Sequence, residues 1–135
     1  MVFKLDQESV LQLELPWPPS VNHYWVTRVI KHRVAKFVGQ KGKEFREAVK
    51  QAVEPHLSHC EEHFKGEARL AVVVTIISPD KRKRDVDNLC KALLDAMEHA
   101  GAYDDDSQID SLVLMRDRKH IESGGRVIVG IARIK

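Results

Sequence analysis

The residues with the clearest chemistry lie in one charged segment, residues 79–91. The segment holds four consecutive cations followed by two carboxylates, in the order Lys81, Arg82, Lys83, Arg84, Asp85 and Asp87. Lysines and arginines grouped in this way bind the phosphates of nucleic acid, because each contact releases condensed counterions. Blocks of like charge are also found simply as solvated loops. Because this block lies between a predicted buried strand and a predicted helix, its position favours a binding site.

The carboxylates offer metal chemistry together with a third acidic element, Asp104–Asp106. Three carboxylates that converge form a hard-oxygen site suited to Mg²⁺, an ion that promotes phosphodiester hydrolysis by activating water. Lys91 follows Asp87 by four residues, which on a helix places it where it can stabilise the developing charge or orient the phosphate. The alternatives are structural. They are an N-cap with an ordinary ion pair for Asp85, Asp87 and Lys91, and a plain acidic loop for Asp104–Asp106.

The elements that must position these groups follow from hydrophobic periodicity. Residues 69–77 are β-branched and apolar on both faces, which predicts a central buried strand. Residues 87–99 carry apolar side chains at helical spacing, and Gly101 suits the C-terminal end of that helix. Residues 109–115 and 126–134 are predicted strands. A helix of about 13 residues is roughly 20 Å long. The acidic turn therefore meets Asp85 only if the chain returns, which pairing of strands 109–115 and 69–77 would allow.

The N-terminal half supplies the remaining elements. Residues 9–15 alternate as a strand that stops at the prolines of 16–19, and residues 27–38 predict a hairpin or extended ribbon. Helical spacing over 45–53 ends near Pro55, and residues 56–66 are interpreted as a polar connection. The order of elements predicts an α+β fold: one small domain over 1–135, with a mixed β-sheet packed against helices. A strip of cations either contacts a second stretch of phosphates or is a solvated face: Lys31, Arg33, Lys36, Lys41 and Lys43.

Composition excludes several classes of protein. The 135 residues suit one domain, and 22 lysines and arginines against 20 acids leave a net charge of +2. That balance excludes a histone-like protein that binds nucleic acid by bulk charge, although it allows a basic patch. The longest apolar run, 70–77, is too short for a bilayer, so no membrane association is expected. Two cysteines and an N-terminus without the pattern of a secretory signal predict a cytoplasmic protein.

A second cluster has ligand-like spacing but a weaker pattern: His56, His59, Cys60 and His63. Read as ligands, these side chains would form a zinc site. Because no second ligand pair occurs elsewhere in the chain, a His-rich polar loop or helix end is the favoured interpretation. Trp17 and Trp25, beside the proline-rich turn, are interpreted as packing residues, with stacking on splayed bases as the alternative.

With these motifs in view, the sequence resembles the RusA family of crossover-junction endodeoxyribonucleases (Holliday junction resolvases) of bacteria and their phages. The resemblance rests on four motifs, in family order and spacing, at residues 15–25, 79–96, 105–109 and 124–126. They read Leu-Pro-Trp-Pro-Pro-Ser-Val-Asn followed by Tyr24-Trp25, then the charged segment through Leu94-Asp95-Ala96, then Asp-Asp-Ser-Gln-Ile, then Gly-Gly-Arg. The chain departs from the family pattern over 27–42 and 56–66, where it is longer than a compact member, so DNA contacts outside the core motif do not carry over from the resemblance, whereas the chemistry does.

The resemblance implies a dimer that cleaves two opposed strands of a four-way DNA junction with Mg²⁺, for which Mn²⁺ can substitute. It assigns the metal and catalysis to Asp85, Asp87 and Asp106, with Asp105 as the fallback for the third acid, and it makes Lys91 catalytic. DNA would be held by Lys81, Arg82, Lys83, Arg84 and Asn88. An isologous dimer also matches the two-fold symmetry of a junction. Two other hypotheses remain: a branched-DNA-binding protein without cleavage, and a less selective nuclease of flaps or single strands.

Overall fold

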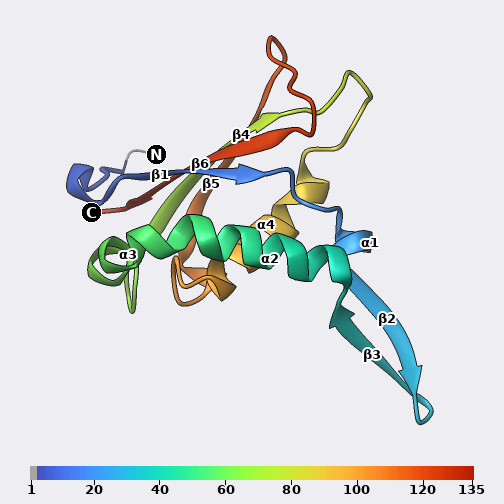
Figure 1. The fold of residues 1–135 in the computed structure, drawn as a ribbon. Helices are drawn as coiled ribbons and strands as arrows, with labels where there is room; N and C mark the ends of the chain where they lie inside the picture. The colour runs from blue at the N-terminus through green and yellow to red at the C-terminus, as the bar shows by residue number, and fades with distance from the viewer. Residues whose placement is uncertain (1–2) are drawn as a thin grey trace.

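A four-stranded sheet in the order β1-β6-β4-β5 organises the chain (Figure 1). The structure is a computed structural model and describes residues 3–135. Strands β1 (Leu11–Pro16) and β4 (Leu70–Ile77) each pair antiparallel with β6 (Arg126–Arg133). Strand β5 (Ile109–Asp117) instead pairs parallel with β4. The sheet is therefore mixed, as the order of elements predicted, and the strand expected to be central lies between β5 and β6.

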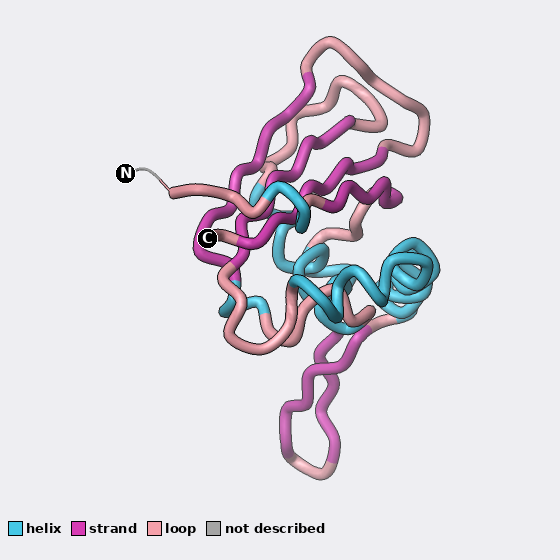
Figure 2. Tube along the Cα trace, turned by 90° about the vertical axis from the view of Figure 1, so that its left-hand side faces the viewer, coloured by secondary structure: helices cyan, strands magenta, loops and turns pink. Residues whose placement is uncertain are grey.

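Helices α2 (Gln40–Val53), α3 (Leu57–His63) and α4 (Asp87–His99) lie on one side of the sheet (Figures 1 and 2). In β1 the side chains of Leu11, Leu13 and Leu15 are buried while those between them are exposed, so this face carries the core. The predicted α+β fold is confirmed. Within residues 3–135 no helix is long and apolar enough to cross a membrane. Short helical turns complete the structure: Gln7–Ser9, α1 (Val21–Tyr24), Glu54–His56 and Asp106–Gln108.

The expectation that residues 69–77 are buried on both faces is wrong for the middle of the strand. Val73 in β4 is 39% exposed because no helix among residues 3–135 covers that face of the sheet. Val72 and Val74, on the other face, are fully buried in the core. The run of β-branched residues therefore correctly predicted that β4 is a central strand, but it did not show whether helices cover the second face of the sheet.

The connection expected over residues 56–66 is also wrong, because most of it forms α3. Helix α2 ends at Val53 as predicted, but Pro55 lies in the first turn of the next helical segment. The missing N–H of a proline is not needed at that position, so the chain continues helically. Cys60 and Phe64, four residues apart, are fully buried by this turn of the chain.

The predicted hairpin is confirmed as β2 (Trp25–Ile30) and β3 (Arg33–Val38), which project from the body of the protein (Figures 1 and 2). Lys31 and His32 form its tip with φ of 49° and 66°. Two consecutive residues in the left-handed region make a turn whose twist matches that of the strands. The hairpin pairs with no strand of the four-stranded sheet and forms a separate ribbon.

Candidate active site

The charged segment forms the connection between the end of β4 and the start of α4, and one ion pair shapes it. The Arg84 guanidinium donates to both carboxylate oxygens of Asp80, at 2.7 and 3.0 Å. These hydrogen bonds from Arg84 lower the pKa of Asp80 to about 2. The backbone N–H of Arg82 donates to the same carboxylate at 2.9 Å, and Arg116 donates to the carbonyl of Arg84. Arg84 is therefore held in place, whereas Lys81 and Lys83 form no ion pair with any residue of 3–135.

Asp85 and Asp87 are exposed, and neither carboxylate makes a contact that stabilises the fold within residues 3–135. The N-cap position of α4 is Val86, which makes no side-chain capping bond. Within residues 3–135 neither carboxylate accepts a hydrogen bond or forms an ion pair, so the capping alternative is not what the structure contains. Two uncommitted carboxylates at a helix start, next to a fixed arginine, leave their oxygen atoms available to a cation.

Lys91 lies one turn along α4 from Asp87, yet the two side chains do not form the ion pair that their spacing allows. The Nζ of Lys91 instead lies 5.5 Å from the ring centroid of Trp25, at the base of the hairpin. An ammonium group in that position is attracted by the face of the ring. The Nζ of Lys36 lies 4.8 Å from the same ring centroid. Trp25 also packs edge-on against Tyr24, with the two ring centroids 4.3 Å apart. The aromatic base of the hairpin thus positions the lysine beside the start of α4.

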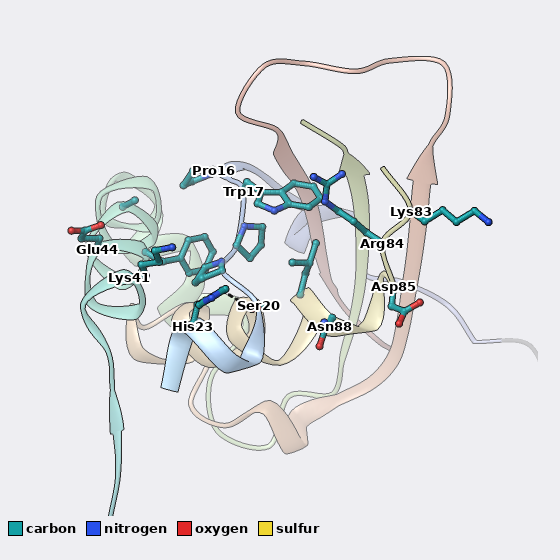
Figure 3. Close-up of a pocket in the computed structure, with 15 residues that line it drawn as sticks. Pro16, Trp17, Ser20, His23, Lys41, Glu44, Lys83, Arg84, Asp85 and Asn88 are labelled. Carbon is teal, nitrogen blue, oxygen red and sulfur yellow. Dashed lines mark hydrogen bonds between the residues drawn. The ribbon is translucent and has the colours of Figure 1, made fainter. Parts of the chain in front are cut away.

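A cavity of about 880 Å³ opens beside these groups (Figure 3). It lies between the proline-rich turn, α2 and the start of α4, and this volume falls within the usual range for ligand sites. In Figure 3, Lys41 and Glu44 from α2 lie on one side of the cavity, and Asp85 and Asn88 lie on the other. Trp17 lines the cavity with the Arg84 guanidinium 5.6 Å from its ring centroid. The cavity therefore combines apolar walls with cations and an exposed carboxylate.

The third acid, Asp106, lies at the other end of α4. Its backbone N–H donates to Oε1 of Glu98 at 2.8 Å. Carboxylate oxygens of Glu98, Asp105 and Asp106 lie within 4.8 Å of one another. Asp105 uses its carboxylate as an N-cap for Ser107, and this hydrogen bond lowers its pKa. Asp106 is therefore the freer of the two aspartates. Glu98 is a member of this cluster that the sequence interpretation missed.

One chain does not bring all the predicted acids together. Asp87 and Glu98 are eleven residues apart on α4, which at 1.5 Å per residue is about 16 Å. Strand β5 does lie beside β4, but the pairing is parallel, so Ile109 lies opposite Leu70 rather than Ile77. The expected return of the acidic turn to Asp85 therefore does not take place within the chain. Asp87, Asn88 and Lys91 lie in the first turns of α4, and Asp85 lies just before them in the connection. Asp106 lies in a separate turn near the other end of the helix.

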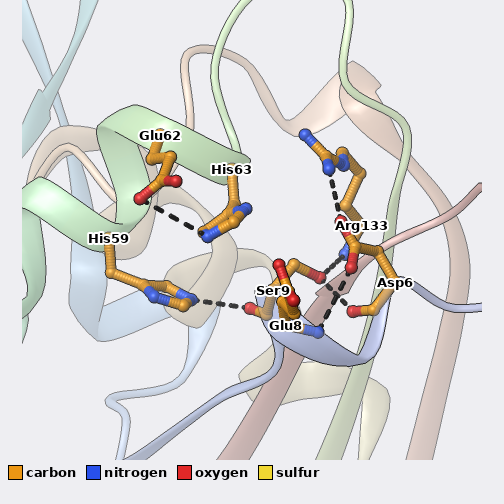
Figure 4. A network of polar contacts seen from close by, with 7 residues as sticks. All are labelled: Asp6, Glu8, Ser9, His59, Glu62, His63 and Arg133. Carbon is orange, nitrogen blue, oxygen red and sulfur yellow. Dashed lines mark hydrogen bonds and ion pairs between the residues drawn. The ribbon is translucent and has the colours of Figure 1, made fainter.

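The histidine cluster has structural roles in the described residues (Figure 4). The Nε2 of His59 lies 2.7 Å from the carbonyl oxygen of Ser9, which joins α3 to the N-terminal turn. Cys60 is fully buried among core residues, and burial raises its pKa. Within residues 3–135 the only clustered set of potential metal ligands is the one at Asp106. The favoured interpretation, a His-rich polar loop or helix end, included the helix in which His59, Cys60 and His63 lie.

Comparisons with known proteins agree with the order of these motifs. The family model described as "Endodeoxyribonuclease RusA" matches residues 16–132. The chain is 34% identical over 124 residues to the crossover junction endodeoxyribonuclease RusA of Enterobacteria phage HK97, covering 92% of this chain and 95% of that protein. It is 29% identical over 127 residues to the protein of that name from Escherichia coli (strain K12), covering 93% and 97%. The protein of that name from Enterobacteria phage 82 is 28% identical over equal coverage.

Proposed function

The chain belongs to the RusA family of endodeoxyribonucleases, and from this premise we propose that it resolves four-way (Holliday) DNA junctions by metal-dependent cleavage of opposed strands. The observation that carries the proposal is the pair of exposed, uncommitted carboxylates, Asp85 and Asp87, which directly follows the cationic connection. Carboxylates placed beside phosphate-binding cations would weaken DNA binding through repulsion unless a metal ion bridges them to the phosphate. This arrangement therefore favours cleavage over simple binding.

The donor set fits a hard divalent cation, because every proposed ligand is an exposed carboxylate oxygen. We assign Mg²⁺, with Mn²⁺ as a substitute, to Asp85, Asp87 and Asp106. The chemistry that such an ion supplies is activation of a water nucleophile and neutralisation of charge on the phosphate. Asp106 is preferred over Asp105 because the carboxylate of Asp105 already caps the turn.

Other residues of the chain would bind and orient the DNA. Lys81 and Lys83 are exposed and would contact phosphates, with Arg82 beside them and Asn88 at the wall of the cavity. Arg84 is held by Asp80, so its guanidinium would meet the substrate strand at a defined place. Lys91, held against Trp25, would donate to the oxygen on which negative charge develops during cleavage.

The 16 Å spacing of the acids supports a homodimer in which each metal site takes residues from two chains. One stripe of α4 runs at helical spacing through Asp87 and Lys91, which are exposed, and through Leu94 and Glu98, which are half-buried. If two copies pack these stripes antiparallel across a two-fold axis, Asp87 of one copy approaches Asp106 of the other at both ends. Two equivalent composite sites would then face the two symmetric strands of a junction. Because the relatives come from bacteria and phages, we place this reaction in the bacterial cytoplasm.

The test is cleavage of a synthetic four-way junction in Mg²⁺ by the parent protein and by Asp87→Asn. The parent should cut opposed strands, and the variant should bind the junction but cut about 100-fold more slowly or worse, since metal sites contribute several kcal/mol to catalysis. Glu61→Gln, an exposed carboxylate change on α3, is the matched control and should cut like the parent. Equal rates for Asp87→Asn and the parent would contradict the assignment. Equal cutting of flaps and linear duplex would show a less selective nuclease.

A further inference from the structure

The part of the chain that contains the hairpin is the most one-sidedly charged in the sequence. Residues 15–43 contain six lysines and arginines and none of the 20 acidic residues of the chain. Four of the six cations lie on the hairpin or its tip: Arg28, Lys31, Arg33 and Lys36. None of these four forms an ion pair with any residue of 3–135. Such a surface complements a polyanion rather than a second copy of a cationic hairpin.

The hairpin also carries exposed apolar side chains just before its tip. Val29 and Val34 lie directly opposite one another in the strand register, and they are 74% and 72% exposed. Ile30 adds exposed apolar surface beside the tip on the other face of the ribbon, whereas the exposed Phe37 lies near the base, opposite Val26. Exposed apolar side chains gathered at the end of a projecting element indicate a surface that another molecule covers.

The hairpin is built to keep its direction. Its two-residue turn has a twist matched to the strands, so the tip does not splay. At its base, Tyr24 accepts the backbone N–H of Gly39 on its carbonyl at 2.8 Å, and its hydroxyl donates to Asp95 in α4. Arg46 in α2 donates to that hydroxyl at 2.7 Å and to Asp95 at 2.8 Å. The ribbon is thus fixed to both helices that flank the proposed active site.

We propose that the β2–β3 hairpin is a wedge that enters the branch point of the junction, where Val29 and Val34 pack against bases that are unstacked there. This inference rests on the proposed function. Apolar side chains inserted between base steps are an established means of opening DNA, and flanking cations hold the phosphates on either side. Strands of six residues reach about 20 Å. Because Trp25 contacts Lys91 at the base, the wedge tip would lie about that far from the scissile phosphate.

The test uses a four-way junction with 2-aminopurine at the branch point, bound without divalent metal so that no strand is cut. The parent protein should raise the fluorescence at saturation, because the probe is quenched when it is stacked. Val29→Thr/Val34→Thr keeps the β-branched shape and β propensity but replaces two methyl groups with hydroxyls. This variant should bind with an unchanged salt dependence and lose the rise in fluorescence.

The matched control is Arg28→Gln/Arg33→Gln, which alters the opposite face of the hairpin. It should lower the slope of log affinity against log salt by about 2 while keeping the full rise at saturation. A full rise with the threonine variant overturns the wedge, and a simultaneous shift of that variant from dimer to monomer would assign the tip to the second copy instead. A parent that cuts junctions without any rise overturns the wedge alone. A parent that neither binds nor cuts them overturns the proposed function, and the wedge with it.

Discussion

The backbone N–H of Asp106 donates a 2.8 Å hydrogen bond to Glu98, and this contact anchors the acidic turn to the C-terminal end of α4. The carboxylate of Asp87 belongs to the first turn of that same helix. The helix therefore separates residues 87 and 98 by about 16 Å along its axis in each chain. In the proposed metal site, the two aspartates would therefore come from different chains.

Subunit mixing tests this arrangement directly. Asp87→Asn and Asp106→Asn should each be inactive alone, because every composite site in either homodimer lacks one ligand. Mixed one to one, about half of the dimers should be heterodimers, and each of these holds one site with both aspartates intact. We expect nicking of one strand of a four-way junction to return after mixing. If both aspartates acted within one chain, mixing would restore nothing.

The mixing experiment needs a control for exchange of subunits. Two differently sized versions of the parent protein, mixed in the same way, should form a dimer of intermediate size. A mixture of Asp87→Asn with Asp85→Asn should remain inactive, because both changes fall on the same half of each site, and one defective ligand remains in every composite site.

Replacing Arg84 by glutamine should raise the pKa of Asp80, because it removes the guanidinium that pairs with this carboxylate. The hydrogen bonds from Arg84 hold the pKa of Asp80 at about 2, below its ordinary value of 3.8. A carboxyl whose pKa is lower in the folded protein stabilises the fold above its unfolded pKa, and this contribution disappears as the pH falls from about 4 to 2. In Arg84→Gln the pKa of Asp80, followed by carboxyl-carbon NMR, should move up towards 3.8. A pKa near 3.8 in the parent would contradict the ion pair.

The two tyrosines predict a loss of stability at alkaline pH. Burial raises the pKa of Tyr24 and Tyr103 well above the ordinary 10.0, and the Asp95 carboxylate raises that of Tyr24 further. Above pH 10 the unfolded chain releases these protons while the folded chain keeps them, so the free energy of unfolding should fall with rising pH. The slope should reach up to about 1.4 kcal/mol per tyrosine per pH unit. Phenolate absorbance should appear only with unfolding; ionisation of the folded protein near pH 10 would contradict this.

Gly42 should be intolerant of alanine because α2 passes close to the base of the hairpin. A Cβ at Gly42 would lie 2.5 Å from the carbonyl oxygen of Tyr24 and 2.7 Å from Val38. Such overpacking costs about 1–3 kcal/mol of unfolding free energy, measured by urea denaturation. Gly130→Ala is the matched control, because its Cβ would meet nothing closer than 4.0 Å. Equal stability of the two variants would contradict the close approach.

Local patterns along the chain predicted the elements well. The alternation at Leu11, Leu13 and Leu15 and the helical spacing over 87–99 both gave elements that the structure contains. The helix after Pro55 was not predicted. A proline destabilises the interior of a helix but is tolerated in its first turn, and packing of the neighbouring residues decides which position it takes. In this case the buried pair Cys60 and Phe64, at i and i+4, was the available signal for a helix.

The arrangement of the site was less accessible to sequence reasoning. Spacing alone allowed Asp87 and Lys91 to pair, but the lysine is attracted to Trp25, which is distant in sequence. Spacing also allowed strand β5 to return the acidic turn to Asp85. The parallel pairing of Ile109 with Leu70 instead places that turn at the other end of the sheet. Strand direction is decided by the crossover through α4, and no residue type in the strand itself specifies it.

The separation of Asp87 from Asp106 has a consequence for when the protein is active. If the metal ligands are shared between chains as proposed, the rate of cutting should depend on the square of the protein concentration wherever the monomer predominates. Dilution alone would then stop cleavage, because the dimers would dissociate. A four-way junction, which has two equivalent strands, would then bind both copies and complete the two metal sites on its own surface. Ordinary duplex has no such pair of positions and should stay uncut at low protein concentration.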